Sequence, residues 1–186
     1  MKKIIIIGAG AMGSAFAVPC LENKNEVTLV GTHLEDELIN NIQLNNNFHP
    51  ALNIELPSKL KVEKYEKLKS ILEEGIEVIV AGVSSVGIEW FVKQIAKSYK
   101  KNLPIILLTK GLAIEDNELI TLSDKIKKLL KDQGHTDVNI SAIKGPCLAA
   151  GLAYKMRTGT VIANPDIKET EKLKKIISTD YYSTEV

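Results

Sequence analysis

Cysteine and aromatic residues are scarce in this chain, which has two cysteines and 5% aromatic side chains among 186 residues. Cys20 follows a proline in a predicted helix and Cys147 follows a Gly-Pro turn, so the two do not form the dense pattern of a disulfide framework. Such usage is typical of a reducing compartment, and we expect a cytoplasmic location.

Neither sign of charge dominates, and long apolar runs are absent. The formal net charge is +1, with lysines and acids interspersed, which indicates neither a basic nucleic-acid-binding stripe nor an acidic tail. Beyond the N-terminal segment, no apolar stretch approaches the roughly 18 residues of a membrane span. The three histidines lack metal-ligand spacing, and no Ser-His-acid order is visible. We therefore expect a small molecule or a protein as partner, and neither metal chemistry nor triad hydrolysis.

The N-terminal segment MKKIIIIGAGAMGSAFA fits two incompatible interpretations. Lysines, an apolar run and an Ala-x-Ala triplet are typical of a secretory signal peptide. Glycines at positions 8, 10 and 13 would interrupt that apolar core, and Pro19 does not suit a lipoprotein site at Cys20. A buried strand followed by a glycine-rich turn explains the segment better, and we expect no export signal.

The glycines fall in the G-x-G-x-x-G order of a dinucleotide-binding turn. We expect a strand over residues 4–7, a helix over 14–23 and a strand over 26–30, which together form the strand-turn-helix-strand unit that this turn requires. A pyrophosphate would lie at the helix N-terminus, where free N–H groups and the helix dipole attract anions. The ribose-binding acid that normally follows the second strand is missing from its usual position, since Glu35 and Asp36 come slightly late. The choice between NAD and NADP stays open at this point.

Alternating strand and helix patterns continue to the end of the chain, which predicts one α/β domain with a doubly wound, mainly parallel sheet. Further strands are expected over residues 60–65, 77–83, 104–108, 138–143, 160–163 and 181–186. Helices are expected over 34–44, 68–74, 86–99, 114–131, 148–153 and 167–178. Taken alone, the polar segment 44–50 is most simply a connector.

Three sets of residues should lie at the carboxyl ends of parallel strands, where ligands bind in such sheets. Val83, Ser84 and Ser85 follow one strand, and the two serines also suit a helix cap. Lys110 follows the next strand, where its charge can meet an anion or a carbonyl. The turn at 144–147 opens a helix of small residues, whose free N–H groups suit a second anion.

Four motifs occur in a fixed order: GAGAMGSA at 8–15, TKGL at 109–112, GPCLA at 145–149 and TGTVIA at 158–163. With them the whole chain resembles NAD(P)-dependent sn-glycerol-3-phosphate dehydrogenase. The spacing of about 35 residues between the second and third motifs is the most specific feature. The resemblance implies a Rossmann domain, NAD or NADP as cofactor and a small phosphate ester as substrate, in a reaction that interconverts dihydroxyacetone phosphate and sn-glycerol 3-phosphate.

The resemblance also implies roles for individual residues. Cofactor contacts fall on Gly8, Gly10, Ala11, Met12, Gly13, Thr32, Phe48, Val83, Ser84, Ser85, Lys110 and Ala149. Substrate contacts fall on Lys110, Gly145 and Cys147, and Lys110 has a catalytic role at the carbonyl. Phe48 belongs to an N-x-x-F-x-P loop that closes over the cofactor in the family, against the connector interpretation of segment 44–50.

The chain departs from the family pattern at several positions near the substrate. The family has a serine, then serine, threonine or asparagine, then a glutamate and a proline, where this chain has Lys144, Cys147, Gly151 and Arg157. The family also continues into a helical C-terminal domain that carries its general acid–base lysine. We therefore expect residues 1–186 to be the NAD(P)-binding domain, inactive alone and able to self-associate through the surface that this domain would cover.

Two other interpretations remain open from the sequence. The first is a single-domain Rossmann reductase, such as a deazaflavin-dependent NADP oxidoreductase, although its arginine-bearing turn after the second strand is missing here. The second is a non-catalytic nucleotide-binding module.

Overall fold

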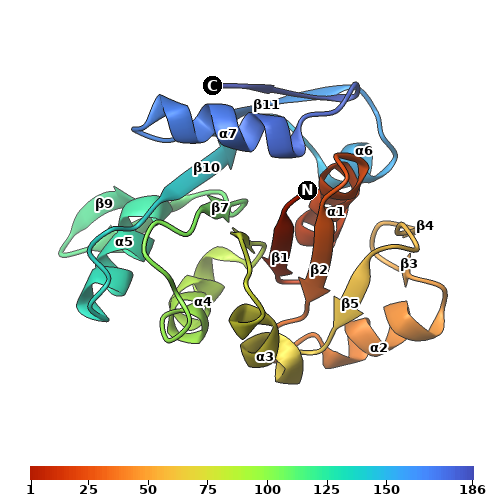
Figure 1. The fold of residues 1–186 in the computed structure, drawn as a ribbon, viewed down its shortest axis with the longest axis horizontal. Coiled ribbons are helices and arrows are strands. Elements are labelled where there is room, and N and C mark those ends of the chain that lie inside the picture. Colours follow the sequence, from red (N-terminus) through yellow and green to blue (C-terminus); the bar gives the residue numbers. More distant parts are fainter.

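The computed structural model describes residues 1–186, with an eight-stranded sheet at its centre (Figure 1). The sheet order is β12-β11-β10-β7-β6-β1-β2-β5. Its strands are β1 (Lys3–Ile7), β2 (Glu26–Val30), β5 (Lys61–Glu63), β6 (Val78–Ala81), β7 (Ile105–Leu107), β10 (Ile140–Lys144), β11 (Thr158–Ala163) and β12 (Tyr182–Glu185). All neighbours pair in parallel except β10 and β11. The predicted doubly wound, mainly parallel sheet is confirmed.

Helices cover both faces of the sheet, since each strand side chain must be buried on one face or the other. One face carries α1 (Ala11–Glu22), α2 (Asp36–Leu44), α6 (Ala149–Ala153) and α7 (Ile167–Ile177). The other carries α3 (Leu68–Glu73), α4 (Ile88–Ile95) and α5 (Leu122–Asp132). Short 3₁₀ turns, Tyr65–Lys67 and Ser85–Gly87, precede α3 and α4.

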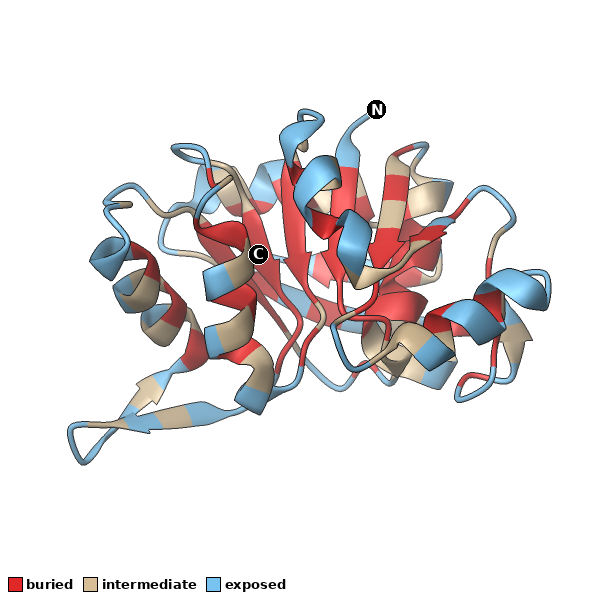
Figure 2. Cartoon of the chain, turned by 90° about the horizontal axis from the view of Figure 1, so that it is seen from below, coloured by how far each residue is buried: buried red, intermediate tan, exposed pale blue.

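The four consecutive isoleucines of β1 contribute to two hydrophobic cores, one on each face of the sheet. Ile4 and Ile6 belong to the core under α1, whereas Ile5 and Ile7 belong to the core under α4, because successive strand side chains point to opposite faces. All four are essentially inaccessible to solvent. Buried residues accordingly fill the central layer in Figure 2. No helix is long and apolar enough to cross a membrane.

The predicted helix over residues 114–131 is wrong in its first part. This part forms an antiparallel hairpin of β8 (Leu112–Glu115) and β9 (Glu118–Thr121), and α5 begins only at Leu122. Asp116 and Asn117 both have positive φ, as the two central residues of a tight hairpin turn do. The helical spacing of the apolar residues is genuine only from Leu122 onward, where the Thr121 hydroxyl caps the helix by accepting from Asp124 N.

The segment after α2 is more than a connector. Residues Phe48–His49 form β3, which pairs with β4 (Ile54–Glu55) in a separate two-stranded sheet. His49 is fully buried although it lies in a polar stretch of sequence. The connector interpretation, drawn from composition alone, missed this packing.

Candidate functional site

The carboxyl ends of β1, β2, β6, β7 and β10 meet at one edge of the sheet, which is where ligands bind in doubly wound folds. Two hollows lie along this edge. The first is lined by Gly10, Ala11, Met12, Thr32, His33, Leu34, Glu35, Gly82, Val83, Ser84, Val86, Gly87 and Trp90. The second is lined by Met12, Gly82, Val83, Ser84, Ser85, Leu108, Thr109, Lys110, Cys147, Leu148 and Ala149. Met12 and the end of β6 belong to both, so the hollows adjoin each other.

The glycines of the turn between β1 and α1 differ in what surrounds them. A Cβ on Gly13 would lie 2.1 Å from Gly8 O, and one on Gly8, where φ is +110°, would lie 2.7 Å from Gly82 C. Backbone atoms therefore occupy the space that a side chain at Gly8 or Gly13 would need. A Cβ on Gly10 would have Glu35 Oε1 as its nearest neighbour, at 3.9 Å. Because nothing in the protein requires glycine at position 10, its bare backbone leaves room for a ligand.

The N-terminus of α1 adds an attraction for anions beside this space. Gly10 is its N-cap residue, and no side chain caps the helix there. The N–H groups of the first turn have no partners within the helix. An anionic group in front of Gly10 would meet those donors and the positive end of the helix dipole.

The backbone of Ala9, within the glycine turn, is fixed by three side chains. Its oxygen accepts from Ser14 Oγ at 2.9 Å and lies 3.0 Å from His49 Nε2. His49 Nδ1 accepts from Leu52 N at 3.3 Å, so the neutral ring carries its proton on Nε2 and donates it to Ala9 O. The β3–β4 unit thereby holds the glycine turn in place. Sequence reasoning missed His49, since its distance of 40 residues from Ala9 gives no local signal.

Glu35 binds the backbone N–H of the same residue, Ala9. Its Oε2 accepts from Ala9 N at 3.0 Å and from Thr32 N at 2.7 Å. One carboxylate oxygen thus joins the turn after β1 to the turn after β2. The sequence placed Glu35 slightly beyond the usual position of a ribose-binding acid, and only the tertiary structure shows that the side chain folds back to the cleft.

Two lysines lie near each other, where Lys110 lines the second hollow and both lysines line a small neighbouring pocket. Lys110 Nζ donates to Gly145 O at 3.0 Å, and Lys144 Nζ donates to Thr109 O at 2.8 Å. Neither forms an ion pair with a carboxylate. Burial, with a smaller contribution from the Lys110 charge, lowers the pKa of Lys144. This end of the cleft therefore holds positive charge that no protein anion neutralises.

Cys147 lies beside these lysines but is itself buried. Burial raises the pKa of its thiol above the ordinary value. It is a protonated, weakly reactive thiol and shapes the hollow rather than acting as a nucleophile.

Most of the residues singled out from the sequence gather in these hollows. Ala11, Met12, Thr32, Val83, Ser84, Ser85, Lys110, Cys147, Ala149 and Gly10 line one or both, and Gly145 lies beside Lys110. Gly8 and Gly13 shape the turn from behind. Phe48 lines neither hollow, and no side chain caps the 3₁₀ turn after Ser84. The structure contains no group of three or more His, Cys, Asp or Glu side chains that could hold a metal ion.

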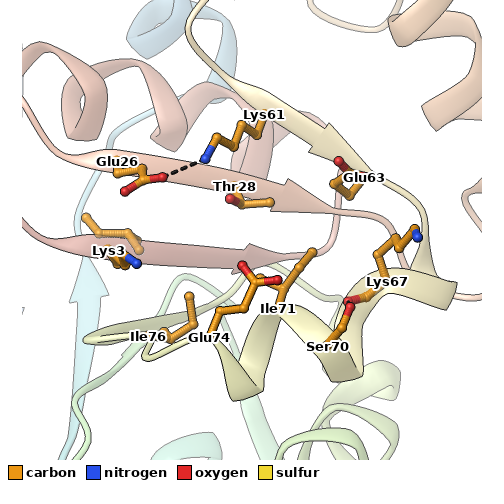
Figure 3. A pocket seen from close by; sticks show the side chains of 11 residues that line it. Lys3, Glu26, Thr28, Lys61, Glu63, Lys67, Ser70, Ile71, Glu74 and Ile76 are labelled. Carbon is orange, nitrogen blue, oxygen red and sulfur yellow. Dashed lines mark hydrogen bonds and ion pairs between the residues drawn. The ribbon is translucent and has the colours of Figure 1, made fainter.

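A separate pocket lies near the opposite ends of the strands, between β1, β2, β5 and α3 (Figure 3). It contains none of the residues singled out above. One pair of its charged side chains is in contact, with Lys61 Nζ 2.6 Å from Glu26 Oε1. Unlike the two hollows, this pocket lies away from the carboxyl ends of the parallel strands, where ligands bind in such folds.

The parallel sheet, the glycine turn and the open space at Gly10 define a dinucleotide-binding domain of the Rossmann class. The chain belongs to the family described as NAD-dependent glycerol-3-phosphate dehydrogenase N-terminus, whose family model matches residues 3–170. The resemblance seen in the sequence motifs is thereby confirmed.

Individual relatives agree with this family. An NADP(+)-dependent glycerol-3-phosphate dehydrogenase of Archaeoglobus fulgidus is 35% identical over 183 residues, covering 98% of this chain and 52% of the relative. A glycerol-3-phosphate dehydrogenase [NAD(P)+] of Mesoplasma florum is 29% identical, covering 97% and 52%. The crystal structure of the Coxiella burnetii glycerol-3-phosphate dehydrogenase shares the fold with a TM-score of 0.83 and 21% identity, covering 99% of this chain and 53% of that one. The chain thus spans about half the length of the relatives it matches.

Proposed function

We propose that residues 1–186 are the NAD(P)-binding part of a glycerol-3-phosphate dehydrogenase, which transfers hydride between NAD(P)H and dihydroxyacetone phosphate or sn-glycerol 3-phosphate. The observation that carries this proposal is Gly10, whose backbone faces open space at an uncapped helix N-terminus. Family membership favours this function over a single-domain reductase and over a non-catalytic module.

The two adjoining hollows suit the two halves of a dinucleotide. The adenosine half fits the first hollow, between the turns after β1 and β2, and the pyrophosphate fits in front of Gly10. The nicotinamide half fits the second hollow, against Val83 and Ala149. Met12, which lines both, lies where the two halves join.

Lys110 and Lys144 act on the substrate side of the cleft. When bound, a nicotinamide cofactor supplies the hydride chemistry. The Lys110 ammonium, held by Gly145 O, stabilises negative charge on the substrate carbonyl oxygen or phosphate. Lys144 adds a second positive charge where the family has serine. The resemblance assigns the general acid–base lysine to the half of the relatives that this chain does not span.

A thermal-shift titration with NADH and NADPH tests the nucleotide site. Nucleotide at about 100 times its dissociation constant stabilises the folded state by roughly 2.7 kcal/mol, which raises Tm by about 5–11 °C for a domain of this size. The absence of a shift with either nucleotide contradicts the proposal.

Turnover is measured by the absorbance of NADH at 340 nm with dihydroxyacetone phosphate. We expect binding without useful turnover, because loss of a general acid alone costs roughly 10²- to 10⁴-fold in rate. A turnover number within the usual range of about 1–10³ s⁻¹ would show that residues 1–186 contain the whole catalytic apparatus.

Location and assembly remain predictions of the same proposal. Both cysteines are free and buried, which agrees with a cytoplasmic protein. Hairpin β8–β9 exposes Leu112, Ile114 and Leu119, which are 58%, 76% and 70% accessible. We expect self-association of the chain at moderate concentration, and a monodisperse monomer in light scattering contradicts this expectation.

A further inference from the structure

The end of β2 decides how a Rossmann domain treats the adenosine ribose. A carboxylate there accepts hydrogen bonds from the ribose hydroxyl groups of NAD, whereas NADP carries a phosphate at the 2′ position and needs a positive charge instead. In this chain the residue directly after β2 is Gly31, followed by Thr32 and His33, so neither a carboxylate nor a lysine or arginine stands at the usual position in the sequence.

The structure brings a carboxylate to that place from further along the chain. Glu35 Oε2 is held by two backbone donors, Ala9 N and Thr32 N, which fixes the side chain between the turns after β1 and β2. Oε1 has no hydrogen-bond partner in the protein and lies 3.9 Å from the position that a Cβ on Gly10 would take, in the lining of the first hollow. The carboxylate is thus anchored through one oxygen and offers the other to the cleft.

Positive charge is missing around this carboxylate. No lysine or arginine lines the hollow that contains Glu35, and Glu35 forms no ion pair. The only basic side chain in the lining is His33, whose ring packs against the Trp90 ring at a centroid distance of 5.0 Å. The lysines of the cleft, Lys110 and Lys144, line the small pocket beside Gly145 and Cys147 instead. A 2′-phosphate in the first hollow would therefore face a fixed negative charge with no compensating cation.

We infer that Glu35 is the cofactor-specificity residue of this chain, accepting a hydrogen bond from a ribose hydroxyl of NAD and excluding the 2′-phosphate of NADP. This inference rests on the proposed function, since it requires that a dinucleotide binds at the glycine turn. It predicts a preference opposite to the NADP(+) dependence stated in the name of the Archaeoglobus fulgidus relative.

The test is a pair of dissociation constants, for NADH and for NADPH, measured by fluorescence titration at pH 8 on three proteins. These are the unmodified chain, Glu35→Gln and the control Glu37→Gln. Glutamine keeps an oxygen that can accept from Ala9 N and Thr32 N but removes the negative charge. Glu37 is an exposed carboxylate two residues further along, in the first turn of α2, so its variant makes the same change of net charge outside the hollow.

We expect the unmodified chain and Glu37→Gln to bind NADH at least about tenfold more tightly than NADPH. In Glu35→Gln the ratio of the NADPH dissociation constant to the NADH dissociation constant should fall below about threefold, chiefly through tighter binding of NADPH. Competition between bound NADH and adenosine 5′-phosphate or adenosine 2′,5′-bisphosphate should follow the same pattern, which confines the effect to the adenosine end.

Three results would overturn the inference: NADPH binding as tightly as NADH in the unmodified chain, an unchanged ratio in Glu35→Gln, or an equal change in Glu37→Gln. In each of these cases the nucleotides still bind, so the proposed function stands. Loss of binding for both nucleotides in the unmodified chain would instead overturn the proposed function together with the inference. Unfolding midpoints of the three proteins, measured without nucleotide, establish that each variant is folded.

Discussion

A methyl group added at Gly10 should weaken nucleotide binding without weakening the fold. Its Cβ would have no protein atom closer than 3.9 Å, and the φ and ψ of Gly10, −61° and 171°, are accessible to alanine. Alanine restricts the unfolded chain, which stabilises the fold by about 0.4–1 kcal/mol. It is also a poorer N-cap residue than glycine, which costs about 0.5–1 kcal/mol. The two contributions nearly cancel, so we expect Tm of Gly10→Ala to stay within about 2 °C of the unmodified value.

Nucleotide binding should respond quite differently, because the new methyl group occupies the space expected for the pyrophosphate. We expect the dissociation constant of NADH to rise at least about tenfold, equivalent to roughly 1.4 kcal/mol. At a nucleotide concentration of about 100 times the original dissociation constant, the stabilisation falls from roughly 2.7 to about 1.4 kcal/mol. The thermal shift should therefore fall to about half.

Two further variants make this experiment decisive. Gly151→Ala also adds a methyl group with no neighbour closer than 3.9 Å, but in α6, and should leave the thermal shift unchanged. Gly13→Ala would place its Cβ 2.1 Å from Gly8 O, so the fold itself must move. Overpacking of this kind costs about 1–3 kcal/mol or more, which lowers Tm by roughly 2–12 °C. A full thermal shift in a folded Gly10→Ala protein would refute the assignment of the open space at Gly10 to the cofactor.

Three predictions concern the scaffold and are measured by thermal or urea denaturation. Thr121→Ala removes the α5 cap and should lower stability by about 1 kcal/mol, or Tm by roughly 2–4 °C, whereas an unchanged Tm means that the hairpin–helix junction frays in solution. Asn25→Ala leaves Lys2 N and Ile176 O without their partner, whereas Cys20 O keeps its bond from the backbone N–H of residue 25, and should cost about 1–3 kcal/mol; a cost below about 0.5 kcal/mol means that water replaces the amide. Hydrogen bonds, first from the Lys2 side chain and then from Lys3 N, hold the pKa of Glu77 below its ordinary value of 4.5. The ionised carboxylate therefore stabilises the folded state above that pH, and this stabilisation is lost as the pH falls. Unfolding free energies from pH 6 to pH 3.5 should therefore decline less steeply in Glu77→Gln, and identical slopes contradict the pairing.

Local sequence pattern was sufficient for the elements that begin the chain. The strand of isoleucines, the glycine turn and the second strand appear at the predicted places, with β2 at Glu26–Val30 and β1 at Lys3–Ile7. Here propensity, apolar pattern and turn chemistry agree with one another, so neighbouring residues alone specify the structure. Segment 114–121 is the contrary case. Its apolar residues fit a helical spacing, but the Asp116-Asn117 turn favours a hairpin, and α5 starts only after it.

The sequence by itself determined the fold class, the glycine turn and the strand ends that carry Val83 and Lys110, because each depends on residues close together in the chain. Only the tertiary structure decided which distant side chains reach that turn. His49 and Glu35 bind the backbone C=O and N–H of Ala9 from 40 and 26 residues away, and no periodicity relates them to it. Glu35 reaches the turn because the parallel sheet brings the ends of β1 and β2 together at one edge, whereas His49 reaches it from the separate β3–β4 sheet.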